Sequence, residues 1–166
     1  MNRNSPAIEI DKSERKGNIA RAIDSSPATR APVVSSRPAR ILVADDQRNV
    51  CEVLALLLRS AGYEVAVASD RQSAITALAT THYDVLVTDV AMRTMSAHEL
   101  AHVARSNGRA IAIVATAVSD ELDLALEAAK LGAVAVLQKP FALARLLLEL
   151  SSAIRLRTTT LNQVSE

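Results

Sequence analysis

The sequence predicts an α/β fold in which helices cover both faces of a parallel β-sheet. Five short apolar runs follow one another at spacings of 21 to 26 residues, and they begin near Ile41, Tyr63, Asp84, Ala110 and Val134. A helical pattern of apolar residues lies between successive runs, and a fifth pattern follows the last run. Strands and helices that alternate in this way form parallel sheets, because each crossover helix packs back onto the sheet.

The expected helices are recognised by apolar residues three or four positions apart, which form one stripe along a helix. Gly62, Gly108 and Gly132 follow the first, third and fourth pattern, and glycine favours the end of a helix. In chain order, the five stripes consist of Val50, Val53, Leu54, Leu57 and Leu58; Ala74, Ile75 and Leu78; Leu100 and Val103; Leu122, Ala125, Leu126 and Ala129; and Leu143, Leu146, Leu147, Leu150 and Ile154.

The composition of the 166-residue chain fits one domain with additional segments. Hydrophobic residues make up 49% of the chain and aromatic residues only 2%, so we expect a core of Ala, Val, Leu and Ile. The single cysteine, Cys51, excludes an internal disulfide and favours a cytoplasmic location. No apolar run approaches the roughly 18 residues of a membrane span, and the N-terminus lacks an apolar signal segment.

Three segments follow from the distribution of residue types. Residues 1–39 hold four of the five prolines and no sustained apolar period, so we expect a disordered, mildly basic extension; a basic docking arm is the alternative. Residues 40–157 form the expected domain, and residues 158–166 form a polar C-terminal tail. Residues 41–166 carry 11 Lys and Arg against 14 Asp and Glu, so we expect no direct binding of nucleic acid by the domain.

Polar residues that can support phosphoryl transfer follow four of the five apolar runs. Because the carboxyl ends of parallel strands share one edge of a sheet, we expect these side chains to lie close together. The residues are Asp45 and Asp46 after the first run, Asp89 after the third, Thr116 after the fourth and Lys139 after the fifth.

These residue types predict a site for one divalent cation and one phosphoryl group. Three carboxylates repel one another unless a hard cation such as Mg²⁺ joins them, so Asp45 and Asp46 are expected metal ligands. Asp89 is the expected nucleophile, and Lys139 and Thr116 would bind phosphoryl oxygens. Each residue also has an ordinary alternative as a helix cap, turn or surface residue, but the combination favours the functional interpretation.

Over about residues 40–157 these motifs resemble the receiver domain of two-component response regulators. The resemblance implies a flavodoxin-like sheet of order 2-1-3-4-5 and phosphorylation of Asp89 by a histidine kinase or a histidine phosphotransfer protein. It also implies Mg²⁺ bound with help from the backbone carbonyl of Ala91, a cis peptide before Pro140, and catalysis of the protein's own phosphorylation and dephosphorylation only. The matching motifs are Val43-Ala44-Asp45-Asp46, Val87-Thr88-Asp89, Ala115-Thr116-Ala117 and Gln138-Lys139-Pro140-Phe141.

Five positions depart from the pattern of that family. Arg93 replaces a usual proline and Ala97 a common glycine, which leaves the conformation of the loop after Asp89 open. Val136 replaces an aromatic residue, so no ring can move inward behind Thr116. Ala91 and Val118 cannot orient a water molecule, and we therefore hypothesise a long-lived aspartyl-phosphate.

Residues 98–102 spell a competing motif, HExxH, in which two histidines one turn apart bind zinc and a glutamate activates water. Glu121 lies near the position of a third ligand. Against a zinc peptidase stand the short segment before Gly108, its place at the third expected helix and a chain too small for a second lobe. Adventitious metal binding by His98 and His102 remains open.

Two functional interpretations remain. The first is a phosphorylatable single-domain response regulator that signals through protein-protein contacts with a downstream target, because no output domain is recognised after the last helix. The second is a pseudo-receiver that binds a partner without phosphorylation. The intact set of Asp45, Asp46, Asp89, Thr116 and Lys139 favours the first interpretation.

Overall fold

The computed structural model describes residues 37–106, 108, 110–118 and 121–163, and the side chains of 121–125 and 158–163 are not described. Most of the predicted N-terminal extension, residues 1–36, therefore lies outside the described residues. Strands and helices alternate through the described part, as the apolar spacing predicts. The elements are β1 (Arg40–Ala44), α1 (Arg48–Ser60), β2 (Glu64–Ala68), α2 (Arg71–Thr80), β3 (Val85–Asp89), α3 (Ala97–Ser106), β4 (Ala112–Ala117), α4 (Glu121–Leu131), β5 (Ala135–Gln138) and α5 (Leu143–Gln163).

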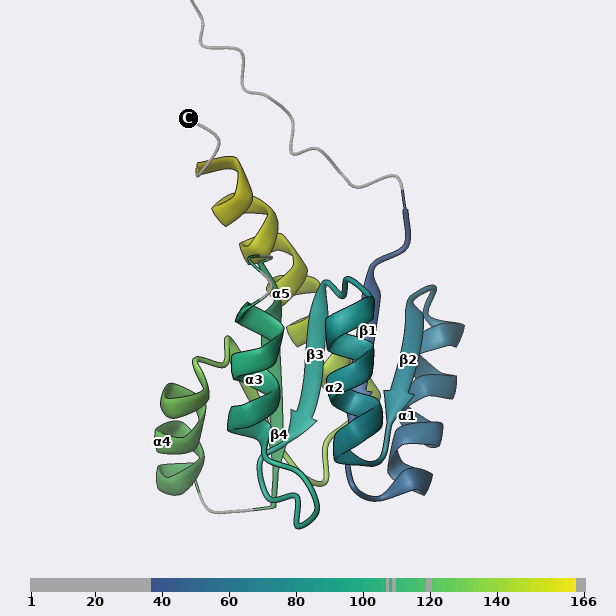
Figure 1. Cartoon of the computed structure of the whole chain (residues 1–166), viewed down its shortest axis with the longest axis vertical. Helices are drawn as coiled ribbons and strands as arrows, with labels where there is room; N and C mark the ends of the chain where they lie inside the picture. The colour runs from purple at the N-terminus through teal and green to yellow at the C-terminus, as the bar shows by residue number, and fades with distance from the viewer. Residues whose placement is uncertain (1–36, 107, 109, 119–120, 164–166) are drawn as a thin grey trace, which may run out of the picture. The chain divides into compact units, whose positions relative to one another are not determined.

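The described strands form one parallel sheet in the order β2-β1-β3-β4-β5, which confirms the predicted topology (Figure 1). The central strand β3 pairs with β1 on one side and β4 on the other. In this register Asp89 lies opposite Thr116, and Thr88 lies opposite Ala44. The carboxyl ends of β1, β3 and β4 therefore meet at one edge of the sheet.

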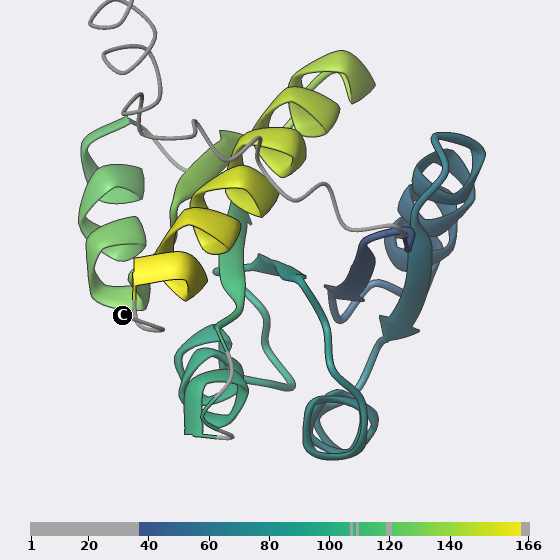
Figure 2. The ribbon, with the colours of Figure 1, turned by 90° about the horizontal axis from the view of Figure 1, so that it is seen from above.

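Two apolar clusters sandwich the sheet because alternate strand residues point to opposite faces. Leu42 and Leu86 pack with α2 and α3 in one cluster, while Ile41 and Val85 pack with α1 and α5 in the other. Figure 2 shows the helices in these two layers. Aliphatic residues and alanine dominate both clusters, as the composition predicts, and Tyr83 is the one aromatic residue buried in the described part of the chain.

Helix α5 ends later than the sequence predicts. The expected domain ends at residue 157, but the helix continues to Gln163. Three consecutive threonines, 158–160, cost only a few tenths of a kcal/mol each in helix propensity, so an established helix can continue through them. The polar residues of the tail gave no other sign of helix. No helix in the described part of the chain is both long and apolar enough to span a membrane.

Candidate functional site

The structure brings three of the five predicted site residues into direct contact at the carboxyl edge of the sheet. The Lys139 Nζ atom lies 2.9 Å from Asp45 Oδ2 and 2.9 Å from Asp89 Oδ2. Asp89 is the last residue of β3, Asp45 follows β1, and Lys139 follows β5. Residues that are 94 and 50 positions apart from Lys139 are therefore joined by one ammonium group.

Backbone amides hold one oxygen of each predicted metal-binding carboxylate. These donors come from the turns that follow β1 and β3, so the orientation of the side chains is built into the backbone. The amide nitrogen of Gln47 lies 2.9 Å from Asp45 Oδ1, that of Arg93 lies 2.8 Å from Asp46 Oδ2, and that of Ala91 lies 3.1 Å from Asp89 Oδ1.

At this edge of the sheet the carboxylates outnumber the cationic side chains, and two of the carboxylates are buried. Asp45 and Asp89 are 2% and 5% exposed. Burial lowers the pKa of Lys139, but its hydrogen bonds to Asp45 and Asp89 and their charges outweigh burial, so its pKa is raised and the ammonium stays charged. Asp45, Asp46 and Asp89 together contribute three carboxylates and Lys139 one ammonium, so the formal charges of these side chains sum to minus two, which matches a divalent cation.

The donor atoms fit Mg²⁺, which prefers carboxylate and carbonyl oxygens. Asp45, Asp46 and Asp89 supply such oxygens, and the carbonyl of Ala91 is the predicted backbone ligand. The fit is one of residue type, because as placed here the three carboxylates do not gather into a group that could hold a metal ion, and no other such group of His, Cys, Asp or Glu occurs among the described residues. In this arrangement Lys139 joins Asp45 to Asp89 directly.

Thr116 lies beside Asp89, and the hydrogen bond that connects the two strand ends is made by the backbone of Thr116 and not by its side chain. The side chain is 2% exposed, and the carbonyl of Thr116 accepts a hydrogen bond of 2.9 Å from the amide of Val90, the residue after Asp89. The backbone of Lys139 is held in a similar way, because its amide donates to the carbonyl of Ala117 at 2.7 Å. The turns around Asp89 and Lys139 are thus anchored to the same end of β4.

The remaining predicted positions lie around this group. The peptide between Lys139 and Pro140 is cis, as the resemblance implies. Val136 packs against the cluster that contains α2 and α3, and no aromatic ring stands at this position. Ala91 and Val118 are exposed, Val118 by 72%, and neither carries a polar side chain. The long phosphoryl lifetime inferred from these two residues stays a prediction.

Comparison with known proteins identifies the family. The family model of the response regulator receiver domain matches residues 41–151. The chain belongs to the response regulator receiver domain family. A response regulator receiver protein of Anaeromyxobacter sp. (strain Fw109-5) is 41% identical over 111 residues, which is 65% of this chain and 45% of that protein. The response regulator MprA of Mycolicibacterium vanbaalenii is 36% identical over 122 residues, 74% of this chain and 52% of MprA.

Solved structures agree with this assignment. The chemotaxis response regulator CheY4 of Vibrio cholerae superposes with a TM-score of 0.63 at 27% identity, covering 70% of this chain and 98% of CheY4. The chain spans about half the length of the curated relatives described above. The predicted family and fold of this receiver domain are therefore confirmed.

The HExxH motif does not form a zinc-peptidase site in the described residues of the receiver domain. His98 and His102 are exposed on α3, and no described His, Cys, Asp or Glu completes a metal-binding group of three with them. Glu99 accepts a hydrogen bond of 2.9 Å from Nε of Arg71, and this bond lowers its pKa. The side chain of Glu121, the proposed third ligand, lies outside the described side chains.

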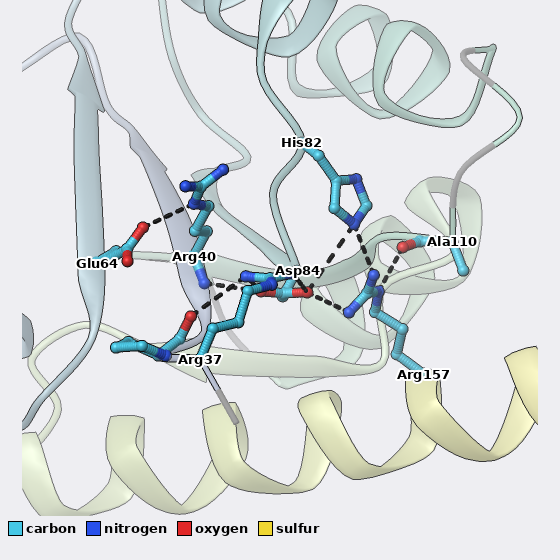
Figure 3. A network of polar contacts seen from close by, with 8 residues as sticks. Arg37, Arg40, Glu64, His82, Asp84, Ala110 and Arg157 are labelled. Atoms are coloured by element: carbon cyan, nitrogen blue, oxygen red, sulfur yellow. Dashed lines mark hydrogen bonds and ion pairs between the residues drawn. The ribbon is translucent and has the colours of Figure 1, made fainter. Parts of the chain in front are cut away.

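A second charged group at the opposite edge of the sheet was not predicted from the sequence. Asp84, immediately before β3, is 3% exposed. Arg37 binds it with both terminal nitrogens, at 3.0 and 3.1 Å, and Nη1 of Arg157 binds its Oδ1 (Figure 3). The amide of Arg40 donates to Oδ2 at 2.7 Å. Only an acidic residue at a strand entrance hinted at this group.

The arginines also tie Asp84 to its neighbours. Arg157 of α5 donates from Nε to the carbonyl of Ala110 at 2.6 Å, and its Nη2 lies 2.6 Å from His82 Nε2. Burial raises the pKa of Asp84, but the Arg40 amide and the arginines outweigh burial, so the pKa is lowered. His82 thus lies against the group of charged residues at the entrance of β3.

Proposed function

We propose that this receiver domain accepts a phosphoryl group from a histidine kinase or a histidine phosphotransfer protein onto Asp89. The observation that carries the proposal is the pair of 2.9 Å contacts from Lys139 Nζ to Asp45 and Asp89. They join a buried carboxylate able to act as nucleophile to a cation able to bind a phosphoryl oxygen. A surface ion pair would need neither the burial nor the convergence of three strand ends.

In the proposed reaction a carboxylate oxygen of Asp89 attacks phosphorus, an O–P bond forms, and the N–P bond to the donor histidine breaks. The Ala91 amide donates a hydrogen bond to Oδ1 of Asp89. This bond fixes the orientation of the carboxylate and keeps the nucleophile aligned. The Lys139 ammonium and the Thr116 hydroxyl bind phosphoryl oxygens and offset their charge. Asp45, Asp46, Asp89 and the Ala91 carbonyl would hold Mg²⁺, which would further neutralise the carboxylate and phosphoryl charges.

The signal would leave the domain through protein-protein contacts in the cytoplasm. Three large apolar side chains that are exposed in α4, just before β5 and in α5 support this part of the proposal, since such residues suit contact with a protein partner. They are Leu126, Val134 and Leu148, with exposed fractions of 56%, 46% and 54%. The mild acidity of residues 41–166 favours a protein target over nucleic acid.

Beryllofluoride, a mimic of the phosphoryl group, tests the proposal in the purified protein. With Mg²⁺ present we expect amide chemical-shift changes around Asp89, Thr116 and Lys139, and we expect their loss in Asp89→Asn. Phosphorylation by acetyl phosphate should add an acid-labile mass to the wild type only. No shift change and no adduct in the wild type would instead support a pseudo-receiver that acts without phosphorylation.

A further inference from the structure

The loop between β3 and α3 contacts two carboxylates that come from different strands. The amide of Ala91 donates to Asp89 Oδ1 at 3.1 Å, and two residues later the amide of Arg93 donates to Asp46 Oδ2 at 2.8 Å. Asp46 and Arg93 are 47 positions apart, so this second bond is a tertiary contact rather than a local turn. One loop thus orients the nucleophile and one member of the acidic pair.

We propose that the backbone amide of Arg93 is a positioning group that holds Asp46 ready for a divalent cation. The inference rests on the proposed function, because it concerns the same cation. Arg93 would act through Asp46, the side chain that its amide contacts. Its contribution is to fix one carboxylate oxygen before the cation arrives.

The hydrogen bonds of Asp46 explain why this matters. Oδ2 accepts from Arg93, while no described residue donates to Oδ1, so one oxygen is held and the other is presented. Unlike Asp45 and Asp89, Asp46 is only partly buried and has no contact with Lys139 among the described residues. Without the Arg93 amide, the Asp46 side chain would become ordered only when the cation binds, and the entropy lost in ordering it would reduce the binding free energy.

The residue type at position 93 decides whether the bond can exist. Arg93 stands where the sequence pattern of receiver domains leads one to expect proline, and proline has no backbone N–H to donate. The Arg93 side chain is exposed and makes no hydrogen bond or ion pair with a described residue. The contribution of the amide can therefore be separated from that of the guanidinium by substitution.

Calorimetric titration of the full chain with Mg²⁺, without a phosphoryl donor, tests the proposal. Arg93→Pro removes the amide proton, whereas the matched variant Arg93→Ala keeps it and removes only the side chain. We expect Arg93→Pro to bind Mg²⁺ about tenfold more weakly than Arg93→Ala, which corresponds to about 1.4 kcal/mol. Equal affinities, or tighter binding by Arg93→Pro, would overturn the inference. A wild type that binds no Mg²⁺ would overturn the proposed function itself.

Hydrogen exchange gives an independent measurement that does not need the proline variant to fold. In EDTA, the Arg93 amide of the wild type should exchange about tenfold more slowly than in Asp46→Ala, because its acceptor is then missing. The Ala91 amide, whose acceptor is Asp89, serves as the internal control and should change less. Equal exchange of Arg93 in both proteins would show that the bond does not form in solution, and the inference would fail.

Discussion

The two ends of β3 carry the same residue type at nearly the same burial, but they differ in the balance of charge around it. Asp84 at the start and Asp89 at the end are 3% and 5% exposed. Each accepts a hydrogen bond from a backbone amide, but Asp84 also contacts two guanidinium groups, whereas Asp89 shares one ammonium with Asp45. At the start of the strand cationic groups outnumber the carboxylate, whereas at its end carboxylates outnumber the cationic group.

This difference separates a structural carboxylate from one suited to chemistry. A buried carboxylate that is fully paired stabilises the positions of the groups around it, here the segment before β1, the loop before β3 and helix α5. A carboxylate that shares its cation keeps the capacity to take up further positive charge. Burial and residue type alone do not distinguish the two, so the count of nearby cations is the informative quantity.

The largest effect should appear when the same substitution, Asp to Asn, is made at each end of β3 and phosphorylation is measured. Asp89→Asn should reduce phosphoryl incorporation from acetyl phosphate by about a hundredfold or more, because an amide is not a nucleophile for phosphorus. Asp84→Asn should keep incorporation in the folded protein. Intact-mass analysis at neutral pH measures both variants. Incorporation into Asp89→Asn at the wild-type level would contradict the assignment of the two ends.

The shared cation should matter for rate. Lys139→Ala removes the ammonium that lies 2.9 Å from Asp89 Oδ2, and we expect phosphorylation to slow about a hundredfold, as for loss of an oxyanion-binding donor. The comparison is with Lys130→Ala, whose ammonium pairs with Glu127 on exposed α4. The time course of adduct formation at fixed Mg²⁺ gives the rates. A similar slowing in both variants would point to a general charge effect.

At the other end, substitution should affect stability. Asp84→Ala leaves the largely buried guanidinium of Arg157 without its carboxylate partner, so the free energy of unfolding should fall by about 3 kcal/mol. Glu64→Ala, which removes the exposed partner of Arg40 at the same edge, should unfold close to the wild type. Urea unfolding followed by circular dichroism tests the pair. Equal stability of the two variants would mean that Asp84 is not a structural centre.

The smallest expected effect is on the pH dependence of the free energy of unfolding, which should differ between the two ends of β3. The lowered pKa of Asp84 means that its contribution is complete above its unfolded pKa of about 3.9 and is lost as pH falls through the folded value. The raised pKa of Lys139 gives a contribution that is complete below about 10.4 and is lost as pH rises through the folded value.

Thermal unfolding across pH in EDTA measures both contributions. The stability difference between wild type and Asp84→Asn should shrink in acid, and the difference between wild type and Lys139→Met should shrink in alkali. If both differences shrink at the same end of the pH range, the two charged groups are not independent.

The sequence predicted the strands and their polar ends because both signals are local. A buried strand is a short apolar run, and a residue such as Asp89 or Lys139 that follows it must lie at the sheet edge. The arginines of Asp84 carried no such signal, since Arg37 and Arg157 lie 47 and 73 positions away in the chain. Long-range pairs of this kind depend on where a helix such as α5 ends in space.

The donors that orient the carboxylates were missed for a different reason. They are backbone amides, and every residue except proline has one, so residue type gives no positive signal. Arg93 was recognised only as the loss of a proline. The gain of an N–H at this position, directed at Asp46, required the structure. The helical end of α5 was missed because polar residues past 157 give no apolar period.

The single thiol of the chain offers a way to observe motion of the first helix. Cys51 of α1 is fully buried, lies 3.3 Å through Sγ from the carbonyl oxygen of Asp45, and burial raises its pKa. A thiol reagent can therefore reach it only when α1 separates from the sheet, so the labelling rate measures that opening. Because the contact is with Asp45, the same rate reports whether cation or phosphoryl binding tightens the anchoring of the helix. Labelling of Cys51 therefore measures the opening of α1 next to Asp45.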